Sequence, residues 1–306
     1  MFDMSNVEVL SEATLMEKQE SLNSYYKDLV GAVNLYIQGI TGEGLVCAII
    51  DSGCDYEHVL LKDKIIGGKN FTDEGAEDDY SDLNGHGTHV AGLIAGGEYG
   101  PFRGGIAPDA KLIIAKALNA EGTGSMEGII EAINWCVDQK VNVINMSLGG
   151  PVDIPELHKA VKRACKKGII VCVASGNEAE SDYGKIDELC YPGAYQEVVE
   201  IGAINKFKVP SYFSNSNNVV DCVTYGQEIL STFPDQSFAV LDGTSMATPI
   251  ASGCVLLIQQ WFEQEFGRKP TKDEVYATLI KCTTEIEGFN RKQQRHGYID
   301  LDKLEN

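Results

Sequence analysis

The chain has 306 residues, 43% of them hydrophobic, and a formal net charge of −20 at pH 7. This length suits one large α/β domain or two small ones with an ample core. The acidic charge argues against nucleic acid and anionic membranes as partners. No stretch approaches the ~18 uncharged apolar residues of a membrane-spanning helix. The N-terminus has neither the basic start nor the apolar run of a secretory signal, so none is expected.

Residues 1–30 are polar and charged with scattered apolar positions, and they look more like a short helical extension than a domain. From about residue 31, short β-branched runs alternate with helix-period stretches. The runs expected to form strands are 45–50, 111–117, 141–146, 168–174 and 197–202. The stretches expected to form helices are 86–95, 125–139, 155–167, 245–262 and 272–281. This alternation predicts an α/β fold with a mainly parallel sheet covered on both faces.

An acidic segment, T-D-E-G-A-E-D-D-Y-S-D, occupies residues 72–82. Runs of like charge usually form solvated loops, and we interpret this one in that way. A cation site is the alternative, because carboxylates are ligands of hard cations.

The chain contains nine cysteines, an odd number, and no C-x-x-C pair. Several of them lie in apolar runs, as small core residues would: Cys47, Cys136, Cys172 and Cys254. We therefore expect free thiols in a reducing compartment, the cytoplasm. A catalytic cysteine is the alternative, but no neighbouring feature supports it.

Three of the expected strands end in unusual polar residues. Asp51 ends the first, Ser147-Leu148-Gly149 ends the third and Gly176-Asn177 ends the fourth. Ligands of open parallel sheets bind beyond the carboxyl ends of the strands. We therefore expect these three ends to open into one crevice.

Two helix starts supply side chains that suit acyl-transfer chemistry. The run N-G-H-G-T-H (84–89) puts His86 at the start of an apolar helix, and D-G-T-S-M-A-T-P (242–249) does the same for Ser245. A serine hydroxyl becomes a nucleophile when a base takes its proton, and an acid must orient that base. Ser245, His86 and Asp51 supply these three residue types, in the chain order Asp, His, Ser.

Each of the three residues also has a purely structural interpretation. Ser245 could cap a helix, Asp51 could end a strand in a turn, and His86 could be a hydrogen-bonded structural histidine. The H-G-T-H run also looks like a metal site, but helical zinc sites favour an i, i+4 spacing with an intervening Glu. Only the combination of the three, on successive strand ends and helix starts, favours catalysis.

The segments around these residues resemble the signature blocks of the subtilisin-like serine proteases. The blocks are Asp51-Ser52-Gly53, His86-Gly87-Thr88-His89-Val90-Ala91-Gly92 and Gly243-Thr244-Ser245-Met246-Ala247-Thr248-Pro249. The resemblance runs from about residue 31 to about residue 285. Two more runs, 64–73 and 145–157, make the chain most similar to the intracellular subtilisins of Bacillus-type bacteria. The resemblance implies the subtilisin-like three-layer α/β sandwich, a serine endopeptidase that needs no cofactor for catalysis, and a homodimer by analogy.

The resemblance also implies roles for residues around the triad. Asn177 would donate its side-chain amide to the developing oxyanion, together with the backbone N–H of Ser245. Two edge segments, Gly122-Thr123-Gly124 and Ser147-Leu148-Gly149, would clamp an extended peptide as an added strand. Without the triad, the same glycines would be interpreted as ordinary loop residues.

A primary pocket for the substrate side chain is the next implication of the resemblance. Its walls would be residues 147–149 and the run Ala174, Ser175, Gly176 and Asn177, with Cys190 near the base and Glu178 near the rim. We expect it to take a medium or large apolar side chain, and Glu178 could also accept a basic one.

Three features depart from the family pattern. Leu60 stands where the family has an Asp that binds structural calcium, and a Leu side chain cannot ligate a hard cation. Arg103, in the loop 96–105, is our candidate for supplying that positive charge, and a second, weaker cation site stays open. Residues 1–30 lack the Pro of the family's inhibitory extension, so we expect self-trimming there. Thr248 and Ile250 replace Ala and His and should change packing rather than activity.

We therefore divide the chain into an N-terminal extension and candidate inhibitory propeptide (1–30), a peptidase domain (31–285) and a C-terminal tail (286–306), interpreted as solvated. The leading hypothesis is a cytosolic serine endopeptidase of broad specificity that acts on peptides or unfolded protein. One alternative is a dedicated maturation protease that removes a specific peptide leader. Another is a catalytically silent subtilisin-like regulator, although such proteins typically lose a triad residue.

Overall fold

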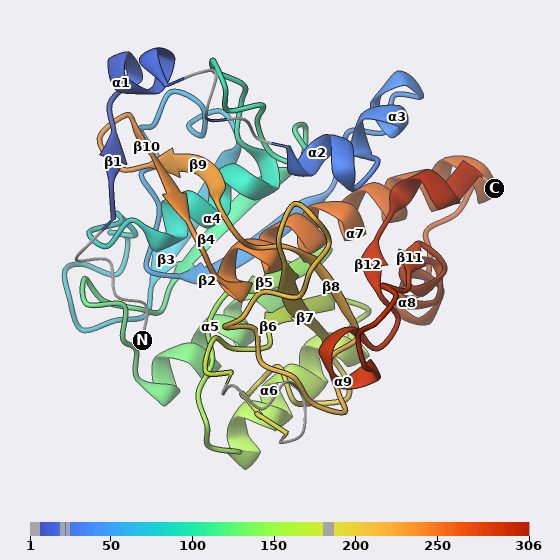
Figure 1. Cartoon of the computed structure of the whole chain (residues 1–306). Coiled ribbons are helices and arrows are strands. Elements are labelled where there is room, and N and C mark those ends of the chain that lie inside the picture. The colour runs from blue at the N-terminus through green and yellow to red at the C-terminus, as the bar shows by residue number, and fades with distance from the viewer. Residues whose placement is uncertain (1–6, 19–21, 23–24, 180–186, 306) are drawn as a thin grey trace.

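A largely parallel sheet runs through the centre of the molecule, which we describe from a computed structural model (Figure 1). The structure describes residues 7–18, 22, 25–179 and 187–305. Within them, nine strands form this sheet in the order β11-β12-β8-β7-β6-β5-β2-β4-β3. Their bounds are β2 Val46–Asp51, β3 Ile65–Asn70, β4 Lys111–Lys116, β5 Val143–Met146, β6 Ile170–Ala174, β7 Val199–Ile204, β8 Cys222–Tyr225, β11 Thr283–Thr284 and β12 Tyr298–Ile299. All neighbours are parallel except β11 and β12.

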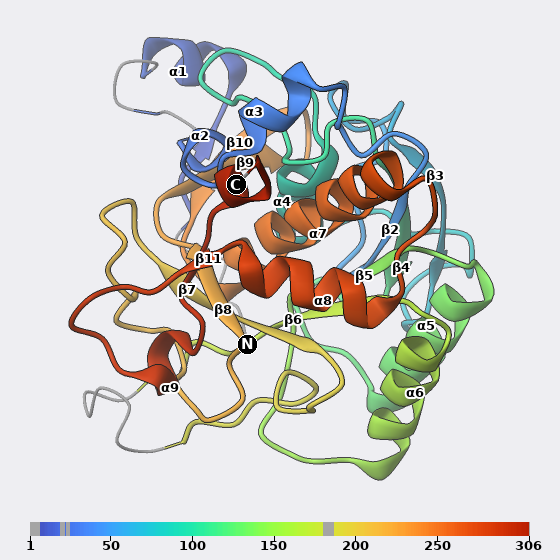
Figure 2. The same ribbon diagram turned by 90° about the vertical axis from the view of Figure 1, so that its right-hand side faces the viewer.

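Helices cover both faces of the sheet and complete a three-layer sandwich. Figure 2 shows α5 and α6 on one side of the sheet and α4 and α7 on the other. Their bounds are α4 His86–Ala95, α5 Met126–Asp138, α6 Pro155–Lys166 and α7 Thr244–Phe266, with α8 Lys272–Lys281 beside α7. The predicted α/β fold with a mainly parallel sheet is confirmed, and each expected strand and helix lies close to its predicted range.

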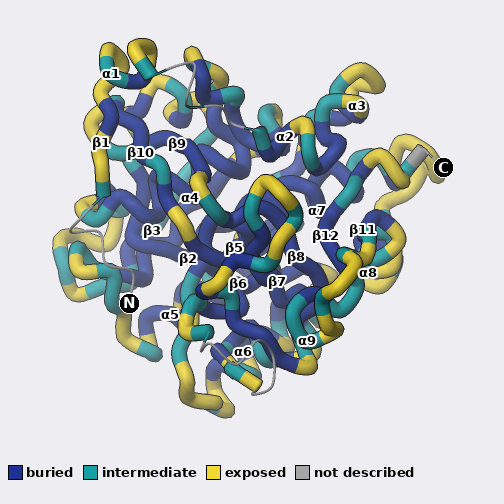
Figure 3. Tube along the Cα trace, viewed as in Figure 1, coloured by how far each residue is buried: buried dark blue, intermediate teal, exposed yellow. Residues whose placement is uncertain are grey.

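The alternation of side chains along each strand divides the core between the two helical layers. In β2, Cys47 and Ile49 join the cluster under α4 and α7, whereas Ala48 and Ile50 join the one under α5 and α6. Successive residues of a strand point to opposite faces, so a strand buried on both faces must be apolar throughout. Figure 3 shows the central strands buried along their length.

A small antiparallel sheet packs beside the main one and includes part of the N-terminal extension. Its strands are β9 Ile229–Phe233, β10 Ser237–Leu241 and β1 Val9–Leu10, with Val9 paired to Ala239. Helix α1 (Glu12–Glu17) follows β1, and Leu10 and Leu15 are buried in a satellite core there. The sequence predicted only a helical extension here, because two residues are too few to show a strand period.

The last part of the extension belongs to the main core. Helix α2 (Tyr26–Leu29) leads into α3 (Ala32–Ile37), and Tyr26 and Val30 are fully buried in the cluster under α7. Residue 31 is therefore not where the core begins.

The C-terminal segment is also part of the fold. Helix α9 (Arg291–Gln294) leads to β12, which pairs with β8 through Tyr298 and Val223, and Ile299 and Leu301 are fully buried. We interpreted residues 286–306 as a solvated tail, and this is wrong for Tyr298, Ile299 and Leu301. Their apolar side chains are buried at the edge of the main sheet. The short 3-10 helix η1 (Leu301–Glu305) ends the described chain, in which no helix is long and apolar enough to cross a membrane.

Candidate active site

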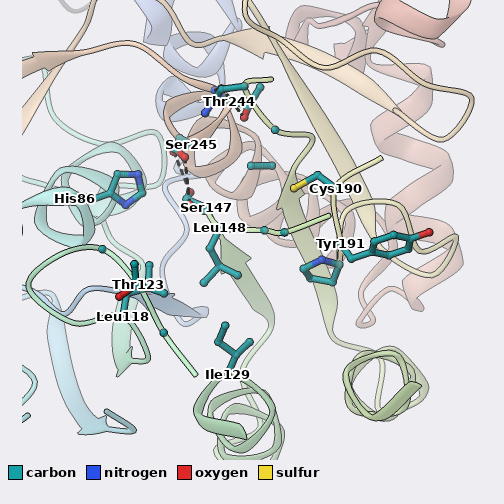
Figure 4. Close-up of a pocket in the computed structure, with 18 of the residues that line it drawn as sticks. His86, Leu118, Thr123, Ile129, Ser147, Leu148, Cys190, Tyr191, Thr244 and Ser245 are labelled. Carbon is teal, nitrogen blue, oxygen red and sulfur yellow. Dashed lines mark hydrogen bonds between the residues drawn. The ribbon is translucent and has the colours of Figure 1, made fainter. Parts of the chain in front are cut away.

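A cleft opens at the carboxyl ends of β5 and β6, where α7 begins (Figure 4). Its lining includes most of the residues expected from the sequence: His86, Gly122, Thr123, Gly124, Ser147, Leu148, Gly149, Ala174, Gly176, Asn177, Glu178, Cys190 and Ser245. Asp51 lies behind His86, and Ser175 is fully buried and does not line the cleft. The three strand ends thus meet in one crevice.

Asp51 and His86 form a buried pair at one end of this cleft. The Asp51 side chain is 0% exposed, and its Oδ1 lies 2.7 Å from Nδ1 of His86. The approach of α4 to β2 depends on glycine, because a Cβ on Gly87 would lie 2.1 Å from the carbonyl oxygen of Gly53. The pair fixes one nitrogen of the imidazole and leaves the ring edge of His86 in the cleft lining.

The electrostatics of the pair favour a protonatable His86. Burial by itself lowers the pKa of His86, but the charge and hydrogen bond of Asp51 and the charge of Asp82 together raise the pKa above its ordinary value of 6.5. A raised pKa makes the imidazole a stronger base and stabilises the imidazolium that forms when it accepts a proton.

Asp82 organises the start of α4, a role that no pattern in the sequence indicated. Its Oδ1 accepts from the Ser52 hydroxyl and the backbone N–H of Gly85, and its Oδ2 accepts from the N–H and hydroxyl of Thr88. Residues 75–79 of the same acidic segment are exposed, as expected of a solvated loop. Asp82 differs because it lies four residues before His86, close enough to accept from the first N–H groups of the helix, which need acceptors.

Ser245 is the second residue of α7, and its surroundings explain why a proline is tolerated in this helix. Pro249 has no N–H to donate to the carbonyl of Ser245, four residues earlier. The hydroxyl of Ser147 donates to that carbonyl instead, at 2.9 Å. In return, the hydroxyl of Ser245 donates to the carbonyl of Ser147 at 3.2 Å, so β5 and α7 are joined at the cleft.

Asn177 is oriented by the residue that precedes the serine. Its Oδ1 accepts from the backbone N–H of Thr244 at 2.8 Å and from the Thr244 hydroxyl at 3.0 Å. Since the oxygen is held in this way, the amide nitrogen is the end directed to the cleft that Asn177 lines. Gly176 precedes it with a φ of 105°, a left-handed conformation that favours glycine.

Cys190 and Gly149, expected to wall the primary pocket, lie against each other in the cleft lining. A Cβ on Gly149 would lie 2.4 Å from the Cys190 sulfur, so the thiol fills the space that a side chain would take. Burial raises the pKa of the Cys190 thiol to about 12, and Glu178 and Glu200 add to the effect. Cys190 is therefore a neutral wall of the pocket, not a nucleophile.

Glu178 lies at the rim with its carboxylate partly satisfied. Its Oε2 accepts from the Asn177 backbone N–H and from the Asn215 amide, both at 2.9 Å. The carboxylate thus holds the Asn177 backbone in place.

Part of the cleft lining is apolar and was not identified from the sequence. It consists of Leu118, Met126, Ile129 and Leu157. Figure 4 shows Ile129 on α5, at the opposite end of the pocket from His86 and Ser245. These residues looked like ordinary core positions in the sequence, because helical periodicity cannot distinguish a residue under a sheet from one that faces a cleft.

The second histidine of the H-G-T-H run has a structural role. His89 is fully buried, and its Nε2 lies 3.1 Å from the carbonyl oxygens of both Ile229 and Ala239. Burial lowers the pKa of His89 to about 3, with the charge of His86 adding to the effect, so the ring is neutral. Among the described residues, no group of three or more His, Cys, Asp or Glu side chains is placed to hold a metal.

The loop 96–105, beside Leu60, receives its positive charge from an unexpected residue. Lys27 is 2% exposed, and its ammonium donates to the Arg103 carbonyl at 2.6 Å and to Glu98 at 3.2 Å. The Arg103 side chain instead pairs with Asp28 near the surface. Our assignment of this charge to Arg103 is therefore wrong, because its backbone carbonyl, not its guanidinium, faces the interior.

Thr248 and Ile250 fit the helix without disturbing the site. Both side chains are fully buried in α7, and the Thr248 hydroxyl donates to the Thr244 carbonyl at 2.8 Å. All nine cysteines are free, and all but Cys165 are buried.

Known proteins are similar in sequence to most of this chain. Residues 42–298 match the family described as the Subtilase family. An intracellular serine protease of Paenibacillus polymyxa is 48% identical over 266 residues, which are 86% of this chain and 81% of that protein. The major intracellular serine protease of Bacillus subtilis (strain 168) is 47% identical over 262 residues, 85% of this chain and 82% of that protein. Subtilisin E of the same organism is 38% identical over 229 residues, 75% of this chain and 59% of that protein. The resemblance seen in the three sequence blocks is thereby confirmed, and the chain belongs to the subtilase family.

Proposed function

We propose that Ser245, His86 and Asp51 form the catalytic triad of this subtilisin-like serine endopeptidase, and that Asn177 completes its oxyanion hole. The observation that carries the proposal is the buried 2.7 Å contact between Asp51 and His86 at the cleft that Ser245 lines. An exposed carboxylate or a histidine remote from the serine would not orient a base toward a nucleophile.

The chemistry follows from these positions. The Ser245 hydroxyl turns from the Ser147 carbonyl toward His86, whose Nε2 takes the proton as Oγ attacks the substrate carbonyl. The Asn177 amide and the Ser245 backbone N–H stabilise the negative oxygen of the tetrahedral intermediate. His86 then gives its proton to the leaving amine, and water hydrolyses the acyl-enzyme by the same route in reverse. Catalysis by subtilases needs no cofactor, so this chain's own residues supply every step.

The substrate is an extended segment of peptide or unfolded protein. Residues 122–124 and 147–149 both line the cleft, and we expect them to pair with the substrate backbone as neighbouring strands. The primary pocket takes a medium or large apolar side chain against Cys190, and Glu178 admits a basic one at the rim. Broad-specificity turnover of protein in the cytoplasm is the physiological role that we propose, in line with the intracellular relatives.

The loop beside Leu60 does not fit the family's calcium site. Lys27 donates to the Arg103 carbonyl and the Tyr26 hydroxyl donates to the Gly104 carbonyl at 3.2 Å, so oxygens suited to a hard cation already accept hydrogen bonds. We propose that Lys27 takes the place of calcium in holding this loop.

The N-terminal extension and the oligomeric state stay predictions. The described residues 7–18, 22 and 25–30 do not line the cleft, and the other extension residues lie outside the described part of the chain. We propose that the extension restrains the enzyme and is trimmed by it, and that the active form is a homodimer. Mass analysis and light scattering of aged protein, with a Ser245→Ala control, test both proposals.

Hydrolysis of unstructured casein and of a chromogenic peptide panel tests the activity. We expect cleavage by the full chain and none by the Ser245→Ala variant. A form that starts at residue 25 tests restraint by the extension, because a later start would remove buried Tyr26 and Lys27. If no substrate is cleaved but a reactive-serine probe still labels Ser245, the result would instead indicate the maturation protease. If no substrate is cleaved and Ser245 is not labelled, the regulator hypothesis would be the one that remains.

A further inference from the structure

A groove between α5 and α6 carries positive charge that is unusual for this acidic chain. Five of the nine residues from 159 to 167 are Lys or Arg, in a chain with 25 such residues against 45 Asp and Glu. Ile130 and Asn134 line the groove on α5, and Lys159, Lys162, Arg163 and Lys166 line it on α6. We call this surface the α5–α6 groove.

Two of the basic side chains at the groove, Arg163 and Lys162, pair with neighbouring residues. Arg163 joins the two helices, because its Nη1 donates to the carbonyl and side-chain oxygens of Asn134, both at 2.9 Å, and its Nη2 pairs with Asp138. Lys162 lies 3.5 Å from Glu197.

Three lysine ammonium groups at the groove are not in ion pairs with the residues that the structure describes. Lys159, Lys166 and Lys167 are exposed, line the groove and form no ion pair with any residue that the structure describes. Glu156 is the acidic residue in the lining, at the start of α6. The groove therefore presents more positive than negative charge to solvent.

The groove and part of the catalytic cleft lining are formed by the same two helices, α5 and α6. Ile129 and Leu157 line the cleft, and the adjacent residues Ile130 and Glu156 line the groove. Figure 4 shows Ile129 where α5 meets the end of the cleft. A peptide that leaves the cleft past Ile129 is therefore next to the two helices that form the α5–α6 groove.

We propose that the α5–α6 groove binds an acidic segment of the polypeptide substrate, N-terminal to the cleaved bond. The inference rests on the proposed function, because the positions of Ser245 and the primary pocket determine the chain direction of the bound peptide. The primary pocket holds the residue whose carbonyl Ser245 attacks, so residues bound toward Ile129 precede that residue in the substrate.

The chemistry of the groove fits such a segment. Carboxylates pair with the lysine ammonium groups, while Ile130 and the lysine methylene stems contact the apolar parts of the same peptide. A net charge of −20 repels acidic peptides from the rest of the surface. A local positive groove beside the cleft thus selects both the substrate and its orientation.

Three peptides test the proposal. They share one cleavable core and differ in a six-residue N-terminal extension that is rich in Asp and Glu, in Ser and Gly, or in Lys. We expect the acidic extension to raise kcat/KM about tenfold over the neutral one, through KM, since three exposed ion pairs of ordinary strength give about that factor. The gain should disappear in 0.5 M salt, where the Debye length is only about 4 Å.

A charge-reversed enzyme and a matched control locate the effect. The variant Lys159→Glu/Lys166→Glu/Lys167→Glu should lose the preference while it cleaves the core peptide normally. The control Lys62→Glu/Lys269→Glu/Lys281→Glu changes the net charge equally at exposed positions outside both lined surfaces and should retain the preference.

Binding measured without catalysis separates this proposal from the proposed function. Fluorescence anisotropy of the labelled acidic peptide should detect binding to the Ser245→Ala variant, weakened about tenfold by the triple charge reversal. Equal binding of all three peptides would overturn the groove proposal, whether or not wild-type enzyme cleaves the core. A change from dimer to monomer on charge reversal, with the peptide preference unchanged, would instead make the groove a contact between copies and would also overturn it.

Discussion

The hydroxyl of Ser147 donates a 2.9 Å hydrogen bond to the carbonyl of Ser245, the carbonyl that Pro249 leaves without its helical donor. The strand end that lines the cleft and the helix that carries Ser245 are thus joined by one side chain. The relationship explains together why a serine follows β5 and why a proline fits inside α7.

A double-mutant cycle tests this relationship. Ser147→Ala leaves a buried carbonyl without a partner, which typically costs about 1–3 kcal/mol. Pro249→Ala restores the helical N–H, so we expect Ser147→Ala to cost measurably less in the Pro249→Ala background. Urea denaturation of the four proteins gives the coupling free energy. Equal costs in both backgrounds would show that the two residues are independent.

The acid limb of the activity profile depends on Asp82. Because the pKa of His86 is raised above 6.5, kcat/KM should fall as the pH drops through a value above 6.5. Asp82→Asn removes one of the charges that raise this pKa, so the acid limb should move to lower pH, whatever happens to the maximal rate. Asp79→Asn changes an exposed acid of the same segment and should leave the limb in place.

Glu200 makes stability fall toward alkaline pH. This side chain is 0% exposed, and burial raises its pKa from 4.5 to about 8 although Asn217 donates to Oε1 at 3.1 Å. A raised acid pKa means that the unfolded chain releases a proton that the folded chain keeps. The contribution to stability is therefore complete below pH 4.5 and is lost as the pH rises through about 8.

The variant Glu200→Gln isolates this effect. In the wild type, Glu200 should make the unfolding free energy at pH 8.5 lower than at pH 4.5 by up to roughly 4–5 kcal/mol, and the variant should lose this difference. The figure follows because each tenfold difference in proton affinity between the folded and unfolded chain corresponds to about 1.4 kcal/mol. Urea denaturation across this range measures it. An unchanged slope in Glu200→Gln would mean that another group titrates, for which buried Asp221, with a pKa also raised by burial, is the first candidate.

Lys27 should hold the loop 96–105 in place without an added ion. Lys27→Met leaves the Arg103 carbonyl and Glu98 without their buried donor, and we expect a loss of about 2–3 kcal/mol and faster proteolysis within the loop. Arg103→Met removes only a surface ion pair and should cost less than about 1 kcal/mol. Thermal unfolding of the wild type should be the same with calcium and with chelator. A large stabilisation by calcium would contradict the role of Lys27.

The sequence by itself predicted five of the nine strands of the main sheet and the five helices α4 to α8. Apolar runs such as 168–174 and amphipathic stretches such as 155–167 encode their secondary structure locally, because the period of side-chain burial follows from strand and helix geometry. Asp51, His86 and Ser245 could be singled out because each lies in a long motif at a strand end or helix start.

Only the tertiary structure decided the features that depend on contacts between distant parts of the chain. Ser147 meets the Ser245 carbonyl across 98 residues, and Lys27 meets the Arg103 carbonyl across 76. Strands of two residues, such as β1 and β12, are too short to show a period, and their pairing is decided by the edge that they complete. Whether an apolar residue such as Ile129 faces a core or a cleft likewise depends on what the folded chain places opposite it, which no local pattern contains.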